Sequence, residues 1–195
     1  MKGKSNKIKI ALKTIVVLIV ILIVLFIWDI RMPTPQIDER FSLEQYERIE
    51  VAPNHYKVDN CWLKKNEYGI WEMYLEGEPY ERGLIYGVLS KELMEKQEVH
   101  FVNQINEIVP NRFFLFFLKM FVAWFNSDLD EYIPEENLTE IYGVSQSFSD
   151  KYNYIAPKYY RILNYHAAHD IGHALQELSM VGCSSFSINN NLSAD

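Results

Sequence analysis

An uninterrupted apolar segment near the N-terminus is the first pattern in this sequence. Residues 14–28 carry fifteen uncharged side chains in a row, and the segment reaches nineteen residues when 10–12 and a snorkelling Lys13 are included. A helix needs about 20 apolar residues to cross the hydrocarbon core of a bilayer. Five lysines precede the segment and Trp28 closes it, which favours a cytoplasmic N-terminus and a tryptophan at the far interface. The pattern predicts a cytoplasmic basic segment over 1–13 and a transmembrane signal-anchor over 14–31.

A cleaved signal peptide is the alternative interpretation of this segment. Such a peptide would end in small residues at its cleavage site, whereas here Phe26, Ile27 and Trp28 precede Asp29. A buried core helix fits poorly with the lysine-dense residues before it. We therefore expect a single-pass membrane protein with an extracytoplasmic body, and the membrane is its first expected partner.

The next pattern indicates a linker and a small β-structure. Two prolines and alternating polar residues open the segment 32–55, so we expect a juxtamembrane linker there. Aromatic and apolar residues at 56–63 and 70–75 are typical of strands. Between them, residues 64–69 form a plausible hairpin turn in which Gly69 supplies a positive φ. A short β-hairpin is therefore predicted.

Helical periodicity dominates the rest of the chain. A long helix is predicted over 82–108, where Gly83 and Gly87 lie four residues apart and would let a neighbouring backbone approach closely. Further helices are expected after Pro134 and over 157–177. The sequence thus predicts a mostly helical α+β protein with an N-terminal transmembrane helix.

A second apolar block, FFLFFLKMFVAWF, occupies residues 113–125. Thirteen residues are too few to cross a bilayer comfortably. We expect a buried core helix here; the alternative is a helix that lies in the membrane interface or lines a lipid-like pocket.

The distribution of charge limits what the body can bind. Residues 1–31 carry a balance of +5 and the rest of the chain a balance of −12, within a total of −7. An acidic body without a basic stripe argues against nucleic-acid binding, because phosphate neutralisation needs clustered Lys and Arg. The two cysteines, Cys61 and Cys183, are too few for a disulfide framework.

Candidate chemistry concentrates near the C-terminus. His166, His169 and His173 are spaced three and four residues apart, so a helix places them on one face, with Asp170 beside them. Three imidazoles with Cys183 as a fourth ligand could bind zinc, although three histidines on one straight helix rarely converge on one ion. A hydrogen-bonded polar face and direct support of catalysis are the other interpretations.

Cys183 follows Gly182, whose missing side chain leaves the preceding peptide carbonyl open to a thiol. A lone cysteine is most often an inert buried side chain. The residues alone leave both interpretations open.

Three segments in order give this chain a family resemblance. They are residues 75–87 (LEGEPYERGLIYG, with Glu81 and Arg82), residues 134–143 (PEENLTEIYG), and residues 164–175 (NYHAAHDIGHAL) followed by 181–186 (VGCSSF). Together they resemble the acyl-coenzyme A:6-aminopenicillanate acyltransferase-like family. Its members are autoprocessing N-terminal-nucleophile (Ntn) hydrolases, related to bile-salt and penicillin V acylases.

The resemblance implies a fold and an activity. It implies the N-terminal part of a four-layer αββα fold and self-cleavage at the Gly182–Cys183 bond. Cys183 would be the mature nucleophile, acting on a small acyl-amide or acyl-thioester substrate in hydrolysis or acyl transfer. His166, His169, Asp170, His173, Glu81 and Arg82 would support the site, and neither a cofactor nor a metal is implied.

The chain ends at Asp195, twelve residues after Cys183. We expect residues 56–182 to form a helical pro-segment and 183–195 to begin a truncated nucleophile domain. The C-terminal Ntn portion, with its oxyanion donors, would be a missing partner, so the 195-residue chain is expected to be inactive alone. Two alternatives stand beside this hypothesis: an extracytoplasmic metal-binding protein that uses His166, His169 and His173, and an inactive membrane-anchored remnant.

Overall fold

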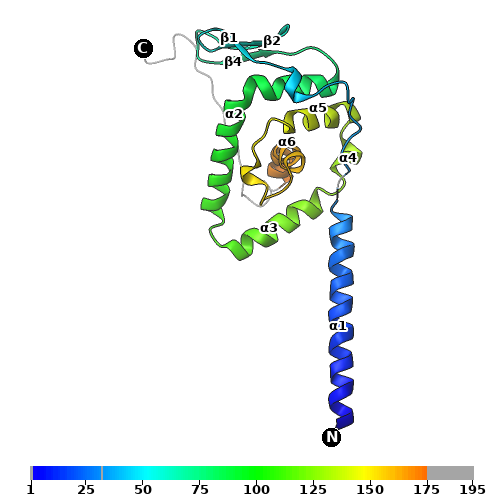
Figure 1. The fold of residues 1–195 in the computed structure, drawn as a ribbon. Coiled ribbons are helices and arrows are strands. Elements are labelled where there is room, and N and C mark those ends of the chain that lie inside the picture. Colours follow the sequence, from blue (N-terminus) through cyan, green and yellow to red (C-terminus); the bar gives the residue numbers. More distant parts are fainter. Residues whose placement is uncertain (1, 32, 175–195) are drawn as a thin grey trace.

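A computed structural model describes residues 2–31 and 33–174, with the side chains of 9–28, 30–31 and 33–167. Helix α1 (Lys2–Asp29) projects from the body, which lies at its C-terminal end (Figure 1). Its segment Lys9–Trp28 is 20 residues long, has a mean hydropathy of 3.3 and is not buried against any other described element. The expected N-terminal apolar helix is therefore present, and its length and composition suit a membrane span or a signal sequence.

A four-stranded antiparallel sheet follows, larger than the single hairpin that was predicted. Its strands lie in the order β1 (Ile49–Ala52), β2 (His55–Val58), β3 (Cys61–Lys65) and β4 (Trp71–Tyr74). The β3–β4 hairpin confirms the turn at Gly69, whose φ is +80°.

The predicted strand over 56–63 is in fact two strands. Asp59 breaks it with a φ of +50°, and the chain turns back so that Val58 pairs with Cys61. Aspartate tolerates this left-handed conformation better than most residues because its short side chain bonds locally. β1 and the 3-10 helix η1 (Leu43–Gln45) both lie within the segment 32–55 that was expected to be a linker.

The helices form the larger part of the body. α2 (Pro79–Ile108) confirms the predicted long helix, and α5 (Glu135–Ser145) begins after Pro134 as expected. α6 (Lys158–Ala174) lies within the predicted helix at 157–177. A short helix α4 (Leu129–Tyr132) and a 3-10 turn η2 (Asp150–Tyr152) complete the described part. Figure 1 shows α6 end-on, with α2, α5, α4 and α3 (Arg112–Phe125) around it.

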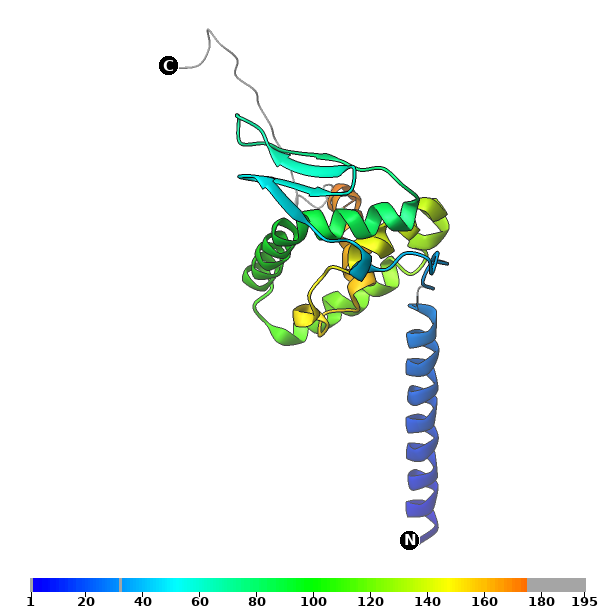
Figure 2. The same cartoon turned by 45° about the horizontal axis from the view of Figure 1, so that its top comes forward.

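Two apolar cores hold these elements together. The first lies between the sheet and the first half of α2, where Ile85 and Leu89 pack on Val58, Cys61 and Leu63. The second joins α2, α5 and α6 through the buried side chains Met94, Leu138, Ile141, Val144, Phe148, Tyr159, Ile162 and Leu163. α2 therefore belongs to both cores and connects the sheet to the helical layer (Figure 2).

The helix over the second apolar block, α3 (Arg112–Phe125), is not the core helix that was expected. It turns back from α2 with a bend of 120° after Pro110, and none of its residues is buried. The core prediction fails because α2, α5 and α6 already fill the interior with one another's side chains. α3 instead lies along the edge of the body with most of its large apolar side chains exposed.

Candidate functional site

The residues with candidate chemistry begin on α6. Of the predicted site residues on α6, His166 has a described side chain. Its ring is exposed, and its Nδ1 lies 2.9 Å from the carbonyl oxygen of Ile162. A carbonyl only accepts hydrogen bonds, so Nδ1 donates and the lone pair of Nε2 is left available as a base or ligand. The backbone of His169, Asp170 and His173 continues α6. Their side chains, and the whole of Gly182 and Cys183, lie outside the described residues.

The zinc hypothesis depends on those same side chains. Among the side chains that the structure describes, no group of three His, Cys, Asp or Glu residues could hold a metal ion. His166 is the described member of the proposed trio, so the described part of the chain shows no metal centre by itself.

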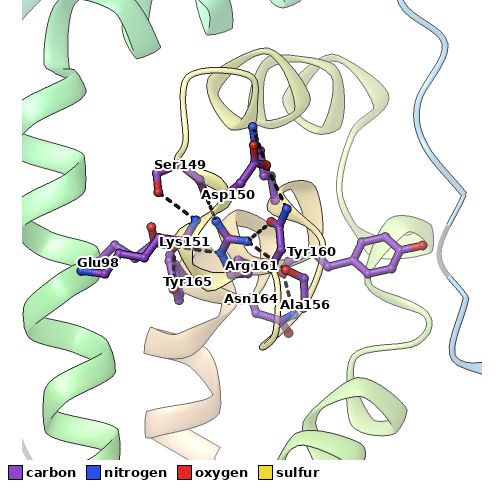
Figure 3. Close-up of polar contacts among 11 residues, drawn as sticks. Glu98, Ser149, Asp150, Lys151, Ala156, Tyr160, Arg161, Asn164 and Tyr165 are labelled. Carbon is purple, nitrogen blue, oxygen red and sulfur yellow. Dashed lines mark hydrogen bonds and ion pairs between the residues drawn. The ribbon is translucent and has the colours of Figure 1, made fainter.

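The buried guanidinium of Arg161 fixes the other end of α6 (Figure 3). Its Nε donates to Oε1 of Glu98 on α2 at 2.8 Å. Nη1 donates to Asn153 Oδ1 at 2.7 Å and to the Ala156 carbonyl at 2.9 Å, and Nη2 donates to the Ser149 carbonyl at 2.8 Å. Both charged side chains are only 1% exposed. A buried ion pair persists only when its remaining donors are bonded as well, and this network meets that condition.

Glu98 connects the same network to the helical turn that carries His166. The hydroxyl of Tyr165 donates to Oε1 of Glu98 at 3.1 Å, and its ring packs edge-on against Phe101 at 4.7 Å between centroids. Burial, followed by the negative charge of Glu98, raises the pKa of Tyr165. The hydroxyl therefore stays protonated and works as a donor. Through Arg161 and Tyr165, α2 fixes the rotation of α6 about its own axis.

Two further hydrogen bonds attach α3 and the segment after it to the body. The amide of Asn126 donates to Oδ1 of Asn164, whose own amide donates to the Tyr160 carbonyl at 2.6 Å. Lys119 Nζ donates to the Tyr154 carbonyl at 2.7 Å. α3 is thus held by polar contacts at its middle and its C-terminal end.

Glu81 and Arg82, the other predicted site residues, lie in the first turn of α2. Glu81 accepts from the backbone N–H of Glu78 at 3.2 Å in a capping box and from the hydroxyl of Tyr46 at 3.2 Å. Arg82 donates to Glu140 of α5, with Nη2 and Oε2 2.6 Å apart, and to the Gly77 carbonyl at 3.1 Å. Of these partners, Glu78 is the N-cap residue of α2, Tyr46 directly follows η1, and Glu140 lies on α5. In the described chain Glu81 therefore caps α2 and holds Tyr46, and Arg82 joins α2 to α5.

The same junction uses the predicted close approach at Gly83. A Cβ built on Gly83 would lie 2.1 Å from the Glu140 carbonyl oxygen and 2.9 Å from the Cα of Gly143. A Cβ on Gly143 would meet the Tyr80 carbonyl at 2.5 Å. The two helices therefore cross backbone to backbone. The sequence predicted this close approach of a neighbouring backbone at Gly83.

A groove of about 500 Å³ lies beside the middle of α2. It runs between the segment 43–48, the middle of α2 and the segment 146–150, and Arg48 and Glu92 are among its lining side chains. None of the described residues predicted for the site lines it. Nothing in its lining brings a nucleophile and a base together.

Sequence reasoning missed the Glu98–Arg161 pair, although one signal pointed to it. Glu98 lies on the same helical row as Ser90, Met94 and Val102, all of them buried. A carboxylate in a row of buried positions needs a cation in return, because an unpaired buried charge is very costly. The sequence offered no comparable signal that Arg161 was that cation.

Comparison of the chain with protein-family models, with curated proteins and with solved structures finds no match.

Proposed function

We propose that this chain is the membrane-anchored N-terminal portion of an Ntn-type acyltransferase or amidohydrolase. One observation carries the proposal: the first two segments on which the resemblance rests pack against each other, and the third begins in the helix beside them. Arg82 of the first segment pairs with Glu140 of the second, and Gly83 lies against Gly143. The third segment continues α6, which shares a core with α2 and α5. The first two segments, far apart in the sequence, thus form one helical junction, and α6 packs beside it.

The support would hold the chain that leads into the nucleophile. α6 is described as far as Ala174, eight positions before Gly182. In the proposed reaction the thiol of Cys183 attacks the carbonyl carbon of Gly182 and forms a thioester. The Gly182–Cys183 C–N bond breaks, and the thiol proton passes to the departing nitrogen, which becomes the α-amino group of Cys183. Water then hydrolyses the thioester and leaves a Gly182 carboxylate and a free thiol.

The freed Cys183 would next act on substrate. An α-amino group has an ordinary pKa of about 8, so it can take the thiol proton near neutral pH. The thiolate attacks an amide or thioester carbonyl, the amine or thiol leaves, and the acyl group passes to water or to an amine. Oxyanion donors are expected from the sequence that would follow Asp195.

The other predicted residues have supporting roles in this proposal. His166 offers Nε2 at the exposed surface of α6, and His169, Asp170 and His173 follow along the same helix. Glu81 and Arg82 are positioning residues, because Glu81 caps the start of α2 and Arg82 joins α2 to α5.

The proposed topology is a single pass through α1 with the body outside the cytoplasm. The length of Lys9–Trp28 and the lysines before it support this arrangement. A protease added to intact cells should then degrade the body and leave α1 with its cytoplasmic lysines. A full-length chain found soluble in the cytoplasm would contradict this topology.

Cleavage at one bond tests the proposed chemistry. We expect the 195-residue chain to stay intact, because the proposed oxyanion donors are expected outside these 195 residues. Removing even one such donor costs about 3–4 kcal/mol of transition-state stabilisation. A version extended past Asp195 through the expected sheets should split, giving a fragment that begins with Cys183 by intact-mass and N-terminal sequence analysis.

Two variants of the extended version serve as the matched pair. Cys183→Ala should abolish the split, while Cys61→Ala should leave it in place. Cleavage of the Cys183→Ala protein at the same bond would assign the cut to another protease and overturn autoprocessing.

A further inference from the structure

The proposed function does not use the exposed face of α3, which carries many large apolar side chains. Its centre is the row Phe113, Phe117, Phe121 and Trp124, with exposed fractions between 52% and 65%. Phe114, Phe116, Leu118 and Phe125 flank this row and are exposed too. Soluble proteins rarely leave so many large apolar side chains together in water, and such patches mark interaction sites.

The opposite side of α3 explains how the helix is oriented. Leu115, Lys119 and Val122 are half-buried against the body, and Lys119 is held by the Tyr154 carbonyl. α3 therefore rests on one narrow side and presents its broad aromatic side outward. The hydrogen bonds of Lys119 and Asn126 to the body fix this orientation.

The position of α3 relative to α1 indicates what can contact its aromatic side. In both Figure 1 and Figure 2, α3 lies on the side of the body from which α1 projects, and the sheet lies on the far side. Residues 30–42 connect α1 to η1, and thirteen residues reach at most about 45 Å. A bilayer that contains α1 is therefore within reach of α3.

The chemistry of α3 also suits a bilayer surface. The helix contains Arg112 and Lys119 and no acidic residue, whereas the chain after residue 31 has a balance of −12. Aromatic side chains prefer the membrane–water interface, and an amphipathic helix binds there by its apolar side with help from basic residues near anionic lipids.

We propose that α3 lies in the interface of the same membrane that α1 spans, and holds the body against the lipid surface. The proposal rests on the anchoring role of α1 and is independent of the chemistry at Cys183. Because α1 keeps the body beside the bilayer, even weak interfacial binding of α3 would be nearly complete. The partner is the phospholipid bilayer itself.

Photo-crosslinking to lipid tests this proposal on the full chain. The protein is placed in nanodiscs of phosphatidylcholine and phosphatidylglycerol that include a phospholipid with a diazirine on its acyl chain, and lipid adducts are mapped by mass spectrometry. We expect adducts on α1 and on α3. The internal control is the β3–β4 turn, where Tyr68 and Ile70 are 80% and 61% exposed but lie in the distant sheet. Adducts on α3 should exceed those on this turn by at least about fivefold, because only an interfacial helix reaches the acyl chains.

Matched variants sharpen the result. Phe117→Asp combined with Phe121→Asp should remove most adducts from α3 and leave those on α1 unchanged. Tyr68→Asp combined with Ile70→Asp should change neither. Labelling of α1 with no more label on α3 than on the turn would overturn the interfacial role alone, and so would α3–α3 crosslinks between copies in place of lipid adducts. An unlabelled α1 would overturn the anchor and this inference with it.

Discussion

The Cα atoms of Gly83 and Gly143 mark the point where α2 and α5 touch backbone to backbone. A Cβ added to either glycine would lie 2.9 Å from the Cα of the other. Both glycines belong to segments on which the proposed function rests, and the Arg82–Glu140 ion pair closes the same crossing. The crossing therefore fixes the helical support on which α6 is built.

We predict that Gly83→Ala destabilises the body by about 2 kcal/mol. Alanine gains roughly 1 kcal/mol of helix propensity, but its methyl group would lie 2.1 Å from the backbone carbonyl of Glu140. A backbone oxygen cannot rotate away, so the helices must separate, and overpacking of this kind costs about 1–3 kcal/mol or more. Urea unfolding in mild detergent, followed by near-UV circular dichroism, measures the change.

Gly87→Ala is the matched control, because its Cβ would meet the Ser147 side chain at 2.3 Å. Ser147→Gly should therefore restore the stability of Gly87→Ala, while no side-chain change should restore Gly83→Ala. Equal costs for the two alanine variants would contradict the backbone contact at Gly83.

The buried pair of Glu98 and Arg161 gives the second prediction. Arg161→Met leaves Glu98 as an uncompensated buried carboxylate and should cost about 3–5 kcal/mol. The double variant with Glu98→Met should recover part of that loss. Recovery is incomplete because the Ser149 and Ala156 carbonyls also lose their donor.

A double-mutant cycle by the same unfolding method checks this coupling. The comparison pair is Lys64 and Glu72, 3.3 Å apart but 42% and 43% exposed, for which we expect a coupling of at most about 1 kcal/mol. A coupling of similar size in both pairs would show that burial does not govern the Glu98–Arg161 interaction.

Two tyrosines with different surroundings give the third prediction. The Tyr165 hydroxyl donates to Glu98, whereas no described atom is a hydrogen-bond partner of the buried Tyr159 hydroxyl. Tyr165→Phe should therefore destabilise the body at pH 7 by about 1 kcal/mol, and Tyr159→Phe should be neutral or stabilising. The opposite order would contradict these hydrogen-bond assignments.

The pH dependence of stability gives the fourth prediction. Burial, followed by the charge of Asp130, raises the pKa of Tyr159 from 10.0 to about 12. Between these values the unfolded chain has lost this proton and the folded chain keeps it, so the free energy of unfolding falls as pH rises from about 10 to about 12. Below pH 9 Tyr159 contributes no such dependence. Tyr159→Phe should flatten this part of the stability curve, and an unchanged curve would refute the shift.

Cys61 gives a further prediction about thiol reactivity. Its side chain is 1% exposed, and Sγ accepts from the Glu76 backbone N–H at 3.4 Å. Burial raises the pKa of this thiol, so little thiolate forms near neutral pH. Cys61 should resist iodoacetamide in the folded protein and react after denaturation, while Cys183, the proposed nucleophile, should react in both states. A Cys61–Cys183 disulfide found by non-reducing peptide mapping would contradict both expectations.

The sequence by itself determined where most helices of this protein lie, but not strand β1 or the break at Asp59. Period and length predicted α1, α2, α5 and most of α6 because each helix has its own apolar pattern. Gly69 predicted its turn because few other residues adopt a positive φ. The close approach at Gly83 was also foreseen, since the spacing of Gly83 and Gly87 is local information.

The tertiary structure decided which apolar and charged residues found partners. The apolar composition of 113–125 suited a core helix, yet the interior was already filled by α2, α5 and α6, so α3 stays exposed. Glu98 and Arg161 are 63 positions apart, and only the packing of α6 on α2 brings them within 2.8 Å. Periodicity describes one element at a time, whereas burial and pairing depend on which elements occupy the same space.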